Sequence, residues 1–334
     1  MAEDIRIELS TGSPDPDRLQ ALRRLAESSQ AADGAPPFSE QTLVELGREH
    51  PDPRQAPLTT ACAFSGQQLI GAAAVIHQHH DGAEQTLTEL TVDPQHRRRG
   101  VATQLASKLA ESVLRTREGV THRAWAHGGH AGGPRLAEAF SWAPVRELWR
   151  MRLANDVQLP EAELDSGVVL RSFRPGADEQ AWLRANAEAF RDHPEQGQLT
   201  LDDLQARMAE DWFDASGFLL AWSQDRDAES AAELLGFHWT KTHPPQQGEG
   251  RGLGEVYAIG VVPAAQGRGL GASLTLAGIE YLRSQGVEAV ILYVDAGNTA
   301  AAQLYKKLGF QVWDIDVQYA PATEAHPGAE SEAA

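Results

Sequence analysis

Residues 259–274 read Ile-Gly-Val-Val-Pro-Ala-Ala-Gln-Gly-Arg-Gly-Leu-Gly-Ala-Ser-Leu, and residues 90–105 read Leu-Thr-Val-Asp-Pro-Gln-His-Arg-Arg-Arg-Gly-Val-Ala-Thr-Gln-Leu. The two stretches share their layout, and Gly100 and Gly269 stand 169 residues apart at the same place in each. A repeat with so long a period indicates two copies of one domain rather than a solenoid of short units.

The repeat sets the expected domain organisation. We expect an N-terminal domain over residues 1–155 and a C-terminal domain over 166–320, each long enough to bury its own core. Residues 151–168 look like a strand end followed by a polar linker. The tail, 321–334, is rich in Ala, Glu, Pro and Gly, a composition typical of disorder.

Composition narrows the class of partner. The 334 residues carry 29 Lys and Arg against 47 Asp and Glu, a formal charge of −18, which argues against nucleic acid and anionic membrane surfaces. No apolar run reaches the roughly 18 residues of a membrane span, and residues 1–6 show no secretion signal. The single cysteine, Cys62, excludes an intrachain disulfide. We expect a cytoplasmic monomer.

Each half alternates expected strands and helices. In the second half the expected strands are 168–173, 217–222, 234–242, 254–262, 289–294 and 311–319. The expected helices are 178–190, one opening at Thr200 with a capping-box start, 267–284 and 298–308. The first half follows the same order less clearly. This alternation predicts an α/β (α+β) fold with a central mixed sheet in each half.

The repeated glycine-rich turn lies between an expected strand and an expected helix. Gly269 and Gly271 let the backbone approach a ligand closely. The first amides of a helix lack intrahelical partners and carry partial positive charge, so such a turn can hold a pyrophosphate. One copy alone is equally compatible with a tight turn that binds nothing. Two copies, each after a Val-x-Pro strand end, favour a ligand.

Two common nucleotide motifs do not fit the turn. A Rossmann fingerprint opens its domain and is followed about 20 residues later by an acidic residue, whereas both turns lie in the middle of their halves. A Walker A loop requires Gly-Lys-Ser/Thr, which is absent from the sequence. Arg97, Arg98 and Arg99 at a helix start suit the phosphates of one small ligand better than nucleic acid.

The spacing Gln/Arg-x-x-Gly-x-Gly/Ala after a strand resembles the acetyl-CoA signature of the GNAT acetyltransferase superfamily, in both halves. Other segments resemble the mycothiol synthase family of tandem GNAT proteins: Ser39-Glu-Gln-Thr-Leu-Val-Glu-Leu-Gly, Trp125-Ala-His-Gly, His193-Pro-Glu-Gln-Gly, Gly236-Phe-His-Trp-Thr-Lys, Leu253-Gly-Glu-Val-Tyr, Pro263-Ala-Ala-Gln-Gly-Arg-Gly-Leu-Gly and Leu292-Tyr-Val-Asp-Ala-Gly-Asn-Thr-Ala-Ala. The resemblance implies acetyl transfer from acetyl-CoA to the cysteine amine of cysteinyl-glucosaminyl-inositol, a small thiol-sugar.

The resemblance also implies a set of acetyl-CoA contacts in each half. Those of the first half are Leu90, Thr91, Val92, Arg98, Arg99, Gly100, Val101, Ala102 and Thr103. Those of the second half are Ile259, Gly260, Val261, Gln266, Gly267, Arg268, Gly269, Leu270, Gly271, Ala272, Asn298, Thr299, Ala300, Ala301, Ala302 and Gln303. We expect the strand residues of each set to pair with the pantetheine arm like an added strand, and the turn residues to bind its phosphates.

Glu255 is the candidate base. In the alternating stretch 254–261 it shares a strand face with Tyr257 and Ile259, while Ala258 faces the other side. A carboxylate in an otherwise apolar strand is unusual, and it could take the proton of an α-amine directly or through water. The pattern alone is also compatible with an exposed strand start, and the resemblance favours the base.

Tyr305 is the candidate acid. Asn298 is a good N-cap, and Gly309 suits the residue after the helix, so Tyr305 falls near the end of this helix. GNAT enzymes commonly place a tyrosine there, near the CoA sulfur. Tyrosine and thiol pKa values, about 10 and about 8.5, are close enough for proton transfer to a leaving thiolate. A core tyrosine beside Phe310 is the alternative.

The backbone amide around Val261 is the candidate donor to the thioester oxygen. We expect the strand to open there, because Pro263 cannot continue a ladder of hydrogen bonds.

The repeat interval predicts that the two halves are unequal. It places Thr86 opposite Glu255 and Leu136 opposite Tyr305, although a two-residue slip would match Glu84 instead of Thr86. The first half contains no tyrosine. We therefore expect catalysis in the C-terminal domain alone and structural CoA binding in the N-terminal one.

The acceptor site is assigned by the resemblance, which points to Glu40, Glu195, Lys241, Glu255 and Tyr293. By the residues alone, Glu40 and Glu195 would be ordinary surface acids. One departure from the family is Gly297, which replaces a usual acidic residue before an Asn, and it implies a more flexible loop or weaker charge at the helix start.

No metal site is expected. Two groups of histidines, His77, His79 and His80 and then His122, His127 and His130, lack a fixed ligand framework, and we expect solvated loop histidines. Two rival functions remain open from sequence: another tandem GNAT enzyme acting on an antibiotic amine or a protein N-terminus, and a CoA-binding sensor without activity.

Overall fold

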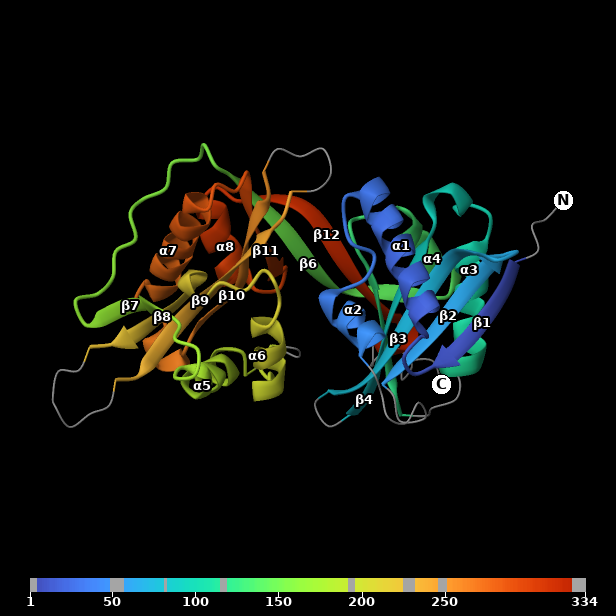
Figure 1. Cartoon of the computed structure of the whole chain (residues 1–334), viewed down its shortest axis with the longest axis horizontal. Coiled ribbons are helices and arrows are strands. Elements are labelled where there is room, and N and C mark those ends of the chain that lie inside the picture. The colour runs from blue at the N-terminus through green and yellow to red at the C-terminus, as the bar shows by residue number, and fades with distance from the viewer. Residues whose placement is uncertain are drawn as a thin grey trace, which may run out of the picture. The chain divides into compact units, whose positions relative to one another are not determined.

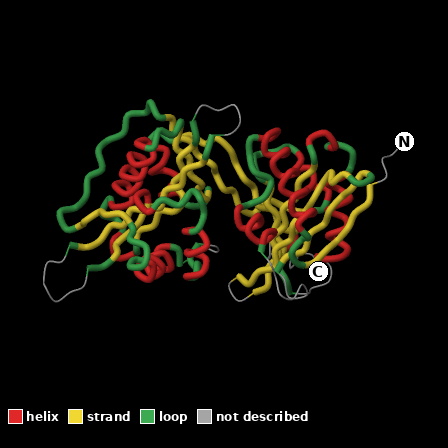
Figure 2. The backbone as a smooth tube through the Cα atoms, viewed as in Figure 1, coloured by secondary structure: helices red, strands yellow, loops and turns green. Residues whose placement is uncertain are grey.

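The computed structural model describes residues 5–48, 57–80, 83–114, 119–191, 196–224, 232–245 and 251–325. The chain divides into two compact units. Unit 1 contains Met1–Leu148 together with Asp314–Ala334, and unit 2 contains Trp149–Trp313. Each unit is an α/β structure with its helices packed against a mixed sheet, as predicted (Figures 1 and 2).

The two repeats fold with the same order of strands and helices. The first repeat comprises β1 (Ile5–Thr11), α1 (Pro16–Asp33), α2 (Glu40–Gly47), β2 (Leu58–Ser65), β3 (Gln68–His80), β4 (Ala83–Val92), α3 (Val101–Leu109), β5 (Thr121–Ala126), α4 (Gly132–Ala139) and β6 (Trp142–Ala154). The second comprises β7 (Val168–Ser172), α5 (Glu179–Ala189), α6 (Leu201–Met208), β8 (Phe218–Ser223), β9 (Leu234–His243), β10 (Leu253–Val261), α7 (Leu270–Ser284), β11 (Ala289–Asp295), α8 (Thr299–Lys307) and β12 (Gln311–Pro321), with the short helix α9 (Ala322–Ala325) after it.

The last strand of each repeat contributes to the other repeat's unit. The strand order is β1-β2-β3-β4-β5-β12 in unit 1 and β6-β11-β10-β9-β8-β7 in unit 2. The C-terminal part of β12 pairs antiparallel with β5, with Val317 opposite Ala126 and Tyr319 opposite Ala124. The C-terminal part of β6 supplies Met151 and Leu153 to the core of unit 2. The expected boundaries, 1–155 and 166–320, follow the repeat and differ from these units at the exchanged strands.

The expected disordered tail begins too early. Residues 321–325 are ordered, because α9 supplies Glu324, whose Oε2 accepts hydrogen bonds from the His122 backbone N–H (3.0 Å) and from Arg123 Nη1 (2.7 Å). Residues 326–334 lie outside the described part of the chain.

Both faces of each sheet are covered by helices. In unit 1, α1 and α2 pack Leu22, Leu25 and Leu46 on one face, and α3 packs Val101 and Leu105 on the other. Because both faces are covered, successive residues of a strand such as β2 are buried whichever face they point to.

Unit 2 repeats this arrangement with a more aromatic core. Trp182 of α5 meets Phe218, Phe237 and Trp239 edge-on at 5.5 Å each. On the opposite face, α7 packs Ile279 and Leu282 against β11 and β6. Such edge-to-face contacts fix ring orientation as well as burying area, so α5 packs firmly on β8 and on β9, the strand next to the one that carries Glu255.

The helix ends form where the sequence places their caps. Thr200 and Asp203 form a reciprocal capping box at the start of α6, as predicted. Asn298 caps α8 by accepting from the Ala301 N–H at 3.2 Å, also as predicted. The Asp295 carboxylate accepts from the Gly297 N–H at 2.8 Å, so an acidic group stands beside the start of α8 although residue 297 is glycine.

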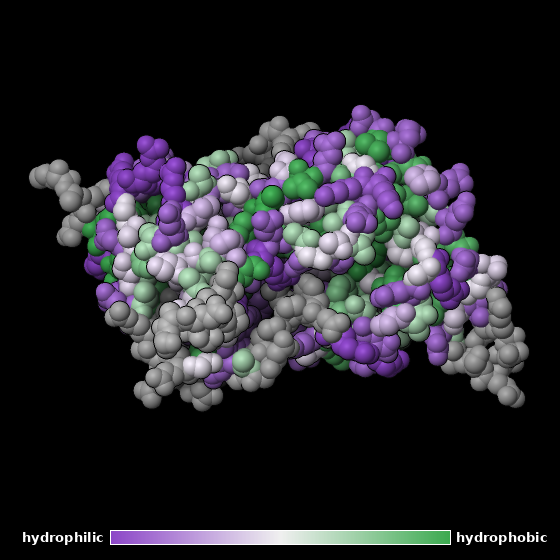
Figure 3. All heavy atoms as spheres, turned by 180° about the vertical axis from the view of Figure 1, so that it is seen from behind, coloured by the Kyte–Doolittle hydropathy of each residue, from purple (hydrophilic) through white to green (hydrophobic). Residues whose placement is uncertain are grey.

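Hydrophilic side chains are distributed over the surface of both units on the face shown in Figure 3. Within the described ranges, no helix is both long and apolar enough to cross a membrane.

Candidate functional site

The glycine-rich turn has the same backbone conformation in both repeats. Gly100 (φ 83°, ψ 4°) and Gly269 (φ 78°, ψ −4°) are the left-handed N-caps of α3 and α7. Two residues earlier, Arg98 (φ 61°) and Gly267 (φ 77°) are also left-handed. A non-glycine residue rarely adopts this conformation, so the first repeat keeps the turn although Arg98 is strained there. The matching backbone angles show that the two repeats contain the same type of turn.

A side chain braces each turn in the same way. Gln266 Nε2 donates to the carbonyl of Val261 at 3.1 Å, and Arg97 Nε donates to the carbonyl of Val92 at 3.0 Å. The Gln/Arg position of the signature therefore ties the turn to the end of the preceding strand.

The strand before each turn separates from its parallel neighbour. β10 pairs with β11 from Gly254 to Val256, yet it stays paired with β9 as far as Val261. In unit 1, β4 pairs with β5 from Gln85 to Glu89 and continues to Val92. The separation frees one side of each strand for a further extended chain, which suits the pantetheine arm.

This separation begins earlier than expected. We predicted that the strand opens around Val261, but it leaves β11 after Val256, and a bulge interrupts the β9 ladder between Val256 and Ala258. The bulge also changes the predicted faces. Ala258 packs with Tyr257 in the aromatic core instead of facing the other side, because the extra residue shifts the alternation. The assignment of the Val261 amide as donor stays a prediction.

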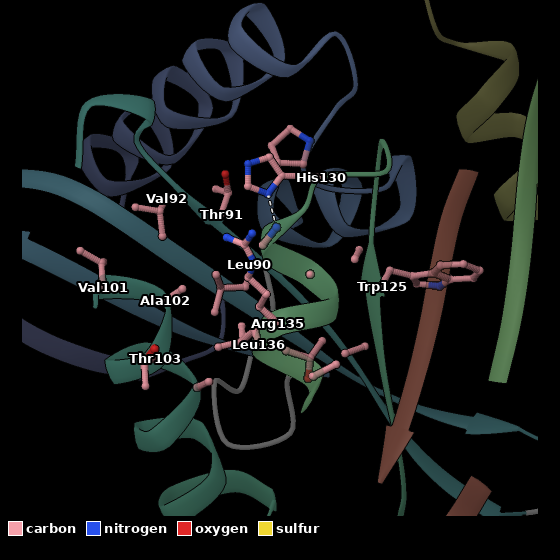
Figure 4. A pocket seen from close by; sticks show the side chains of 18 of the residues that line it. Leu90, Thr91, Val92, Val101, Ala102, Thr103, Trp125, His130, Arg135 and Leu136 are labelled. Carbon is pink, nitrogen blue, oxygen red and sulfur yellow. Dashed lines mark hydrogen bonds between the residues drawn. The ribbon is translucent and has the colours of Figure 1, made fainter. Parts of the chain in front are cut away.

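Open space lies beside the glycine-rich turns. A side chain at Gly271 would meet its nearest neighbour, Val261, only at 3.8 Å, so the protein itself does not require glycine there. In unit 1 a pocket of about 470 Å³ is lined by Leu90, Thr91, Val92, Arg98, Gly100, Val101, Ala102 and Thr103, all of them predicted contacts. Arg135 and Leu136 of α4 also line it (Figure 4). Arg99 is not among the lining residues.

One arginine beside each turn has a carboxylate partner. Arg97 forms two hydrogen bonds with Asp33, at 2.6 and 2.7 Å. In unit 2, Arg268 pairs with Asp165 of the segment before β7 at 2.9 Å, and both side chains are about half exposed. An anionic ligand at the second turn would compete with Asp165 for Arg268.

Glu255 is buried rather than placed at an exposed strand start. It is 8% exposed, and its Oε2 lies 2.5 Å from Nε2 of His243 on β9. The predicted strand stopped at residue 242, one residue before this histidine, so the partner was missed. Extending the strand by one residue would have placed His243 on the face of Lys241 and next to Glu255.

The sheet gathers three of the predicted acceptor residues on one face. Glu255 stands opposite Lys241 on β9 and opposite Ile291 on β11. Tyr293 lies two residues beyond Ile291 and therefore points the same way; it is 37% exposed. The Lys241 ammonium lies 4.4 Å from the ring centre of Trp212 and 5.2 Å from that of Tyr257. These aromatic rings were not predicted as part of the site.

The other two predicted acceptor residues are Glu40 and Glu195. Glu40 is an exposed residue at the first position of α2 in unit 1, and its role stays a prediction. Glu195 lies outside the described residues.

Tyr305 is buried near the end of α8, and burial raises its pKa to about 12. Its ring meets Phe310 edge-on at 5.8 Å. Tyr305 therefore packs in the core beside Phe310, as the alternative to the acid role proposed. The raised pKa keeps the phenol protonated at neutral pH but widens its gap to a thiol pKa of about 8.5, so the role of Tyr305 as acid stays a prediction.

The matching positions of unit 1 lack these groups. Thr86 pairs with His122 in the β4–β5 ladder, as Glu255 pairs with Ile291 in β10–β11. The match of Thr86 with Glu255 nevertheless stays a prediction, because β10 has a bulge between Val256 and Ala258 that β4 lacks. Leu87, the next residue, lies on the face of β4 that packs with α1 and α2. Thr86 is buried, and its hydroxyl lies 2.7 Å from His122 Nδ1. Leu136 stands on α4 where unit 2 has Tyr305.

Unit 1 contains a buried charge network that the sequence did not reveal. His127 Nδ1 and Nε2 donate to Asp316 and Glu89, each at 2.9 Å. Burial opposes the charged ring, but the hydrogen bonds from these two carboxylates prevail and raise the pKa of His127 to about 10. Glu89 also accepts from the Ser39 N–H at 2.9 Å, which ties the start of α2 to the network. Our expectation of solvated histidines is wrong for His127 and for His122, which is also buried.

No group of metal-binding side chains was found where the structure describes the chain. The side chains of His79 and His80 lie outside the described residues.

Known proteins match both the repeats and the whole chain. The Acetyltransferase (GNAT) family model matches residues 20–133 and 181–310. The mycothiol acetyltransferase of Paenarthrobacter aurescens is 47% identical over 330 residues, covering 96% of this chain and 98% of that protein. The mycothiol acetyltransferase of Kocuria rhizophila is 49% identical over 313 residues, covering 92% and 96%. The chain belongs to the mycothiol acetyltransferase family of GNAT proteins.

Solved structures agree on the fold. A GCN5-related N-acetyltransferase from Sphaerobacter thermophilus is 24% identical with a TM-score of 0.65, covering 94% of this chain and 95% of that one. A tandem GNAT protein from the clavulanic acid biosynthesis pathway has a TM-score of 0.66 at 18% identity, covering 94% and 98%. As a member of its family, the chain is an N-acetyltransferase that takes the acetyl group from acetyl-CoA.

Proposed function

We propose that this acetyltransferase acetylates the cysteine amine of cysteinyl-glucosaminyl-inositol to form mycothiol, and that unit 2 carries out the chemistry. The observation that carries the proposal is the buried Glu255, placed at the last residues where β10 and β11 still pair and opposite Lys241. The names of the full-length relatives support this acceptor.

Acetyl-CoA supplies an acetyl group activated as a thioester. Residues 266–272 would hold its phosphates with the amides at the start of α7, where partial positive charge favours an anion. Residues 259–261 would align the pantetheine arm beside β10. The residues from Asn298 to Gln303, at the start of α8, would complete the binding site.

The side chains of unit 2 would manage the protons and orient the amine. Glu255 would take a proton from the ammonium so that the nitrogen can act as a nucleophile. The Val261 N–H would donate to the thioester oxygen as negative charge develops there. Tyr305 would return a proton to the sulfur, and Lys241 and Tyr293 would hydrogen-bond the acceptor's polar groups.

We propose a structural role for acetyl-CoA in unit 1. Its pocket has the turn and the strand edge of a cofactor site, but Thr86 and Leu136 offer neither a carboxylate nor a phenol. Glu40 is proposed to contact the acceptor from α2.

The test follows free CoA when purified protein is mixed with acetyl-CoA and either cysteinyl-glucosaminyl-inositol or a panel of other primary amines. Release of CoA with the thiol-sugar, and acetylation at its nitrogen by mass spectrometry, is expected. Release only with antibiotic amines or peptide N-termini would contradict the proposed acceptor. Binding of acetyl-CoA without release would instead indicate a sensor.

We further propose that the protein works as a monomer in the cytoplasm, without nucleic acid or membrane. The net charge of −18 supports weak affinity for polyanions. Sedimentation at micromolar concentration should give a mass near 36.2 kDa.

A further inference from the structure

His243 makes a short contact with the carboxylate of Glu255. Nε2 of the ring lies 2.5 Å from Oε2 of Glu255. The two residues lie on adjacent antiparallel strands, because β9 ends at His243 and β10 carries Glu255 two residues after Leu253, which pairs with His243. The contact is therefore fixed by the sheet register and does not depend on a loop.

The two side chains differ in their access to water. The side chain of Glu255 is 11% exposed, whereas that of His243 is 36% exposed. A buried carboxylate that accepts a proton in each turnover must also lose it before the next one. An imidazole can pass a proton on, because it accepts at one nitrogen and releases from the other.

We propose that His243 is a positioning residue that holds the Glu255 carboxylate and conducts its proton to solvent. This inference rests on the proposed function, in which Glu255 is the base. The structure thus assigns the deprotonation step to a Glu255–His243 pair rather than to a lone carboxylate.

The proton balance of the step is complete. The ammonium N–H bond breaks, its electron pair stays on the nitrogen, and the proton forms a new O–H bond on Glu255. That proton then moves from Oε2 to Nε2 of His243, and the proton on Nδ1 leaves to water. The carboxylate returns to its charged form and accepts from the Nε2–H of the neutral ring, and exchange of the ring protons with water then restores the Nδ1–H tautomer before the next turnover. One proton reaches solvent for each acetyl group transferred, and no further reactant is needed.

The other charged side chains on this side of the sheet contact aromatic residues. Besides Glu255, the charged side chain nearest in sequence on the same face of β9 is Lys241, whose ammonium packs over the rings of Trp212 and Tyr257. Arg207 of α6 donates to the Tyr257 hydroxyl at 3.1 Å. Among these residues, His243 lies within hydrogen-bonding distance of the Glu255 carboxylate.

The test compares His243→Asn and His243→Ala with the wild type across pH 6 to 9, using the thiol-sugar acceptor. We expect kcat to fall about tenfold or more near pH 7, because the relay is one part of an acid–base effect of roughly 10²–10⁴. KM for acetyl-CoA should stay within about twofold, and the deficit should shrink as pH rises, since hydroxide can then remove the proton. Added imidazole should restore part of the kcat of His243→Ala.

His77→Gln is the matched control, because His77 is a half-buried strand histidine of unit 1 that contacts the Thr59 hydroxyl (3.2 Å) and has no proposed part in catalysis. It should leave the kcat profile unchanged. Wild-type kcat with an unaltered pH profile in His243→Asn would overturn the relay. An equal loss at all pH values without imidazole rescue would also overturn it, because that pattern indicates a structural effect.

The assignment of the acceptor and the proposed relay can be tested separately. If the wild type releases CoA only with another amine, the acceptor assignment fails and the same variants test the relay with that amine. If no amine supports release, both proposals are overturned.

Discussion

The two repeats keep the same cofactor turn but place different side chains around it. Both turns have left-handed residues at matching positions, both are braced to the preceding strand, and both follow a strand that leaves its neighbour. These features depend on the backbone. Proton transfer depends on side chains, and the repeat interval matches Glu255 and Tyr305 with Thr86 and Leu136, which are neither carboxylate nor phenol. A duplicated fold can therefore retain binding while one copy lacks the chemistry.

Buried charge serves a different purpose in each unit. In unit 2 it forms a pair, Glu255 with His243, that is open to water on one side. In unit 1 it forms a closed network, in which His127 bridges Glu89 and Asp316. Since Asp316 comes from β12 and His127 follows β5, the network joins the exchanged strand to its new sheet. The first arrangement suits proton exchange, and the second suits stability.

Removing the base should give the largest loss. Glu255→Gln keeps the size of the side chain but cannot take a proton, so kcat should fall by about 10³-fold, within the usual range for acid–base catalysis. Acetyl-CoA binding, measured by calorimetry, should be unchanged. Glu288→Gln is the control, because this exposed glutamate pairs only with Arg152 among the ion pairs described. Retained turnover in Glu255→Gln would contradict the proposal that only unit 2 carries the catalytic base.

The closed network should control the stability of unit 1. His127→Gln leaves two buried carboxylates without their cation, which should destabilise unit 1 by about 3 kcal/mol. Because the pKa of His127 is raised from 6.5 to about 10, its stabilisation is complete below pH 6.5 and is lost as pH rises through 10. Thermal unfolding should show this decline in the wild type and a flatter profile in the variant. Identical pH profiles would contradict the network's role.

Removing the phenol of Tyr305 should have a smaller effect. Tyr305→Phe preserves the packing against Phe310, so the melting temperature should change little, while kcat should fall about 10- to 100-fold for loss of the proton donor. Tyr281→Phe, which loses a hydroxyl bonded to Asp214, controls for the removal of a tyrosine from the same unit. Equal kcat in the two variants would indicate that Tyr305 has only a core role.

The smallest effect is expected at the strained turn residue. Arg98→Gly places in unit 1 the glycine that unit 2 has at Gly267. It removes the backbone strain of a left-handed non-glycine residue, which should stabilise the protein by about 1 kcal/mol. Loss of the guanidinium should weaken CoA binding to unit 1 by a few fold. Denaturant unfolding and calorimetry measure the two effects, and a destabilised variant would show that Arg98 makes contacts that outweigh its strain.

Local features of the fold followed from the sequence because they depend on a few neighbouring residues. The Asn298 cap, the Thr200–Asp203 box and the paired turns are of this kind. The repeat interval pointed to Thr86 and Leu136 as the matching positions, but the bulge in β10 has no counterpart in β4, so the match of Thr86 with Glu255 stays a prediction. The family was predicted from the resemblance of motifs in both halves, and the hydrophobic periodicity alone did not indicate it.

Long-range features did not follow from the sequence. A strand such as β6 or β12 has the same hydrophobic pattern whichever sheet it joins. The pattern therefore could not predict that each strand contributes to the unit of the other repeat. The bulge near Tyr257 shifts the alternation that had separated Ala258 from Glu255. His127 and Asp316 are 189 residues apart, and only tertiary packing brings them together.

The central claim is that the two turns are alike but only unit 2 is catalytic, and a matched pair of substitutions tests it most directly. Ala102→Glu and Gly271→Glu place the same carboxylate at equivalent positions of the two turns, where it should repel a phosphate. Calorimetry with CoA and turnover are measured for both variants. We predict that each loses one of two bound CoA molecules, that Gly271→Glu abolishes turnover, and that Ala102→Glu keeps kcat within about threefold. Loss of turnover in a folded Ala102→Glu variant, or full turnover in Gly271→Glu, would contradict the account.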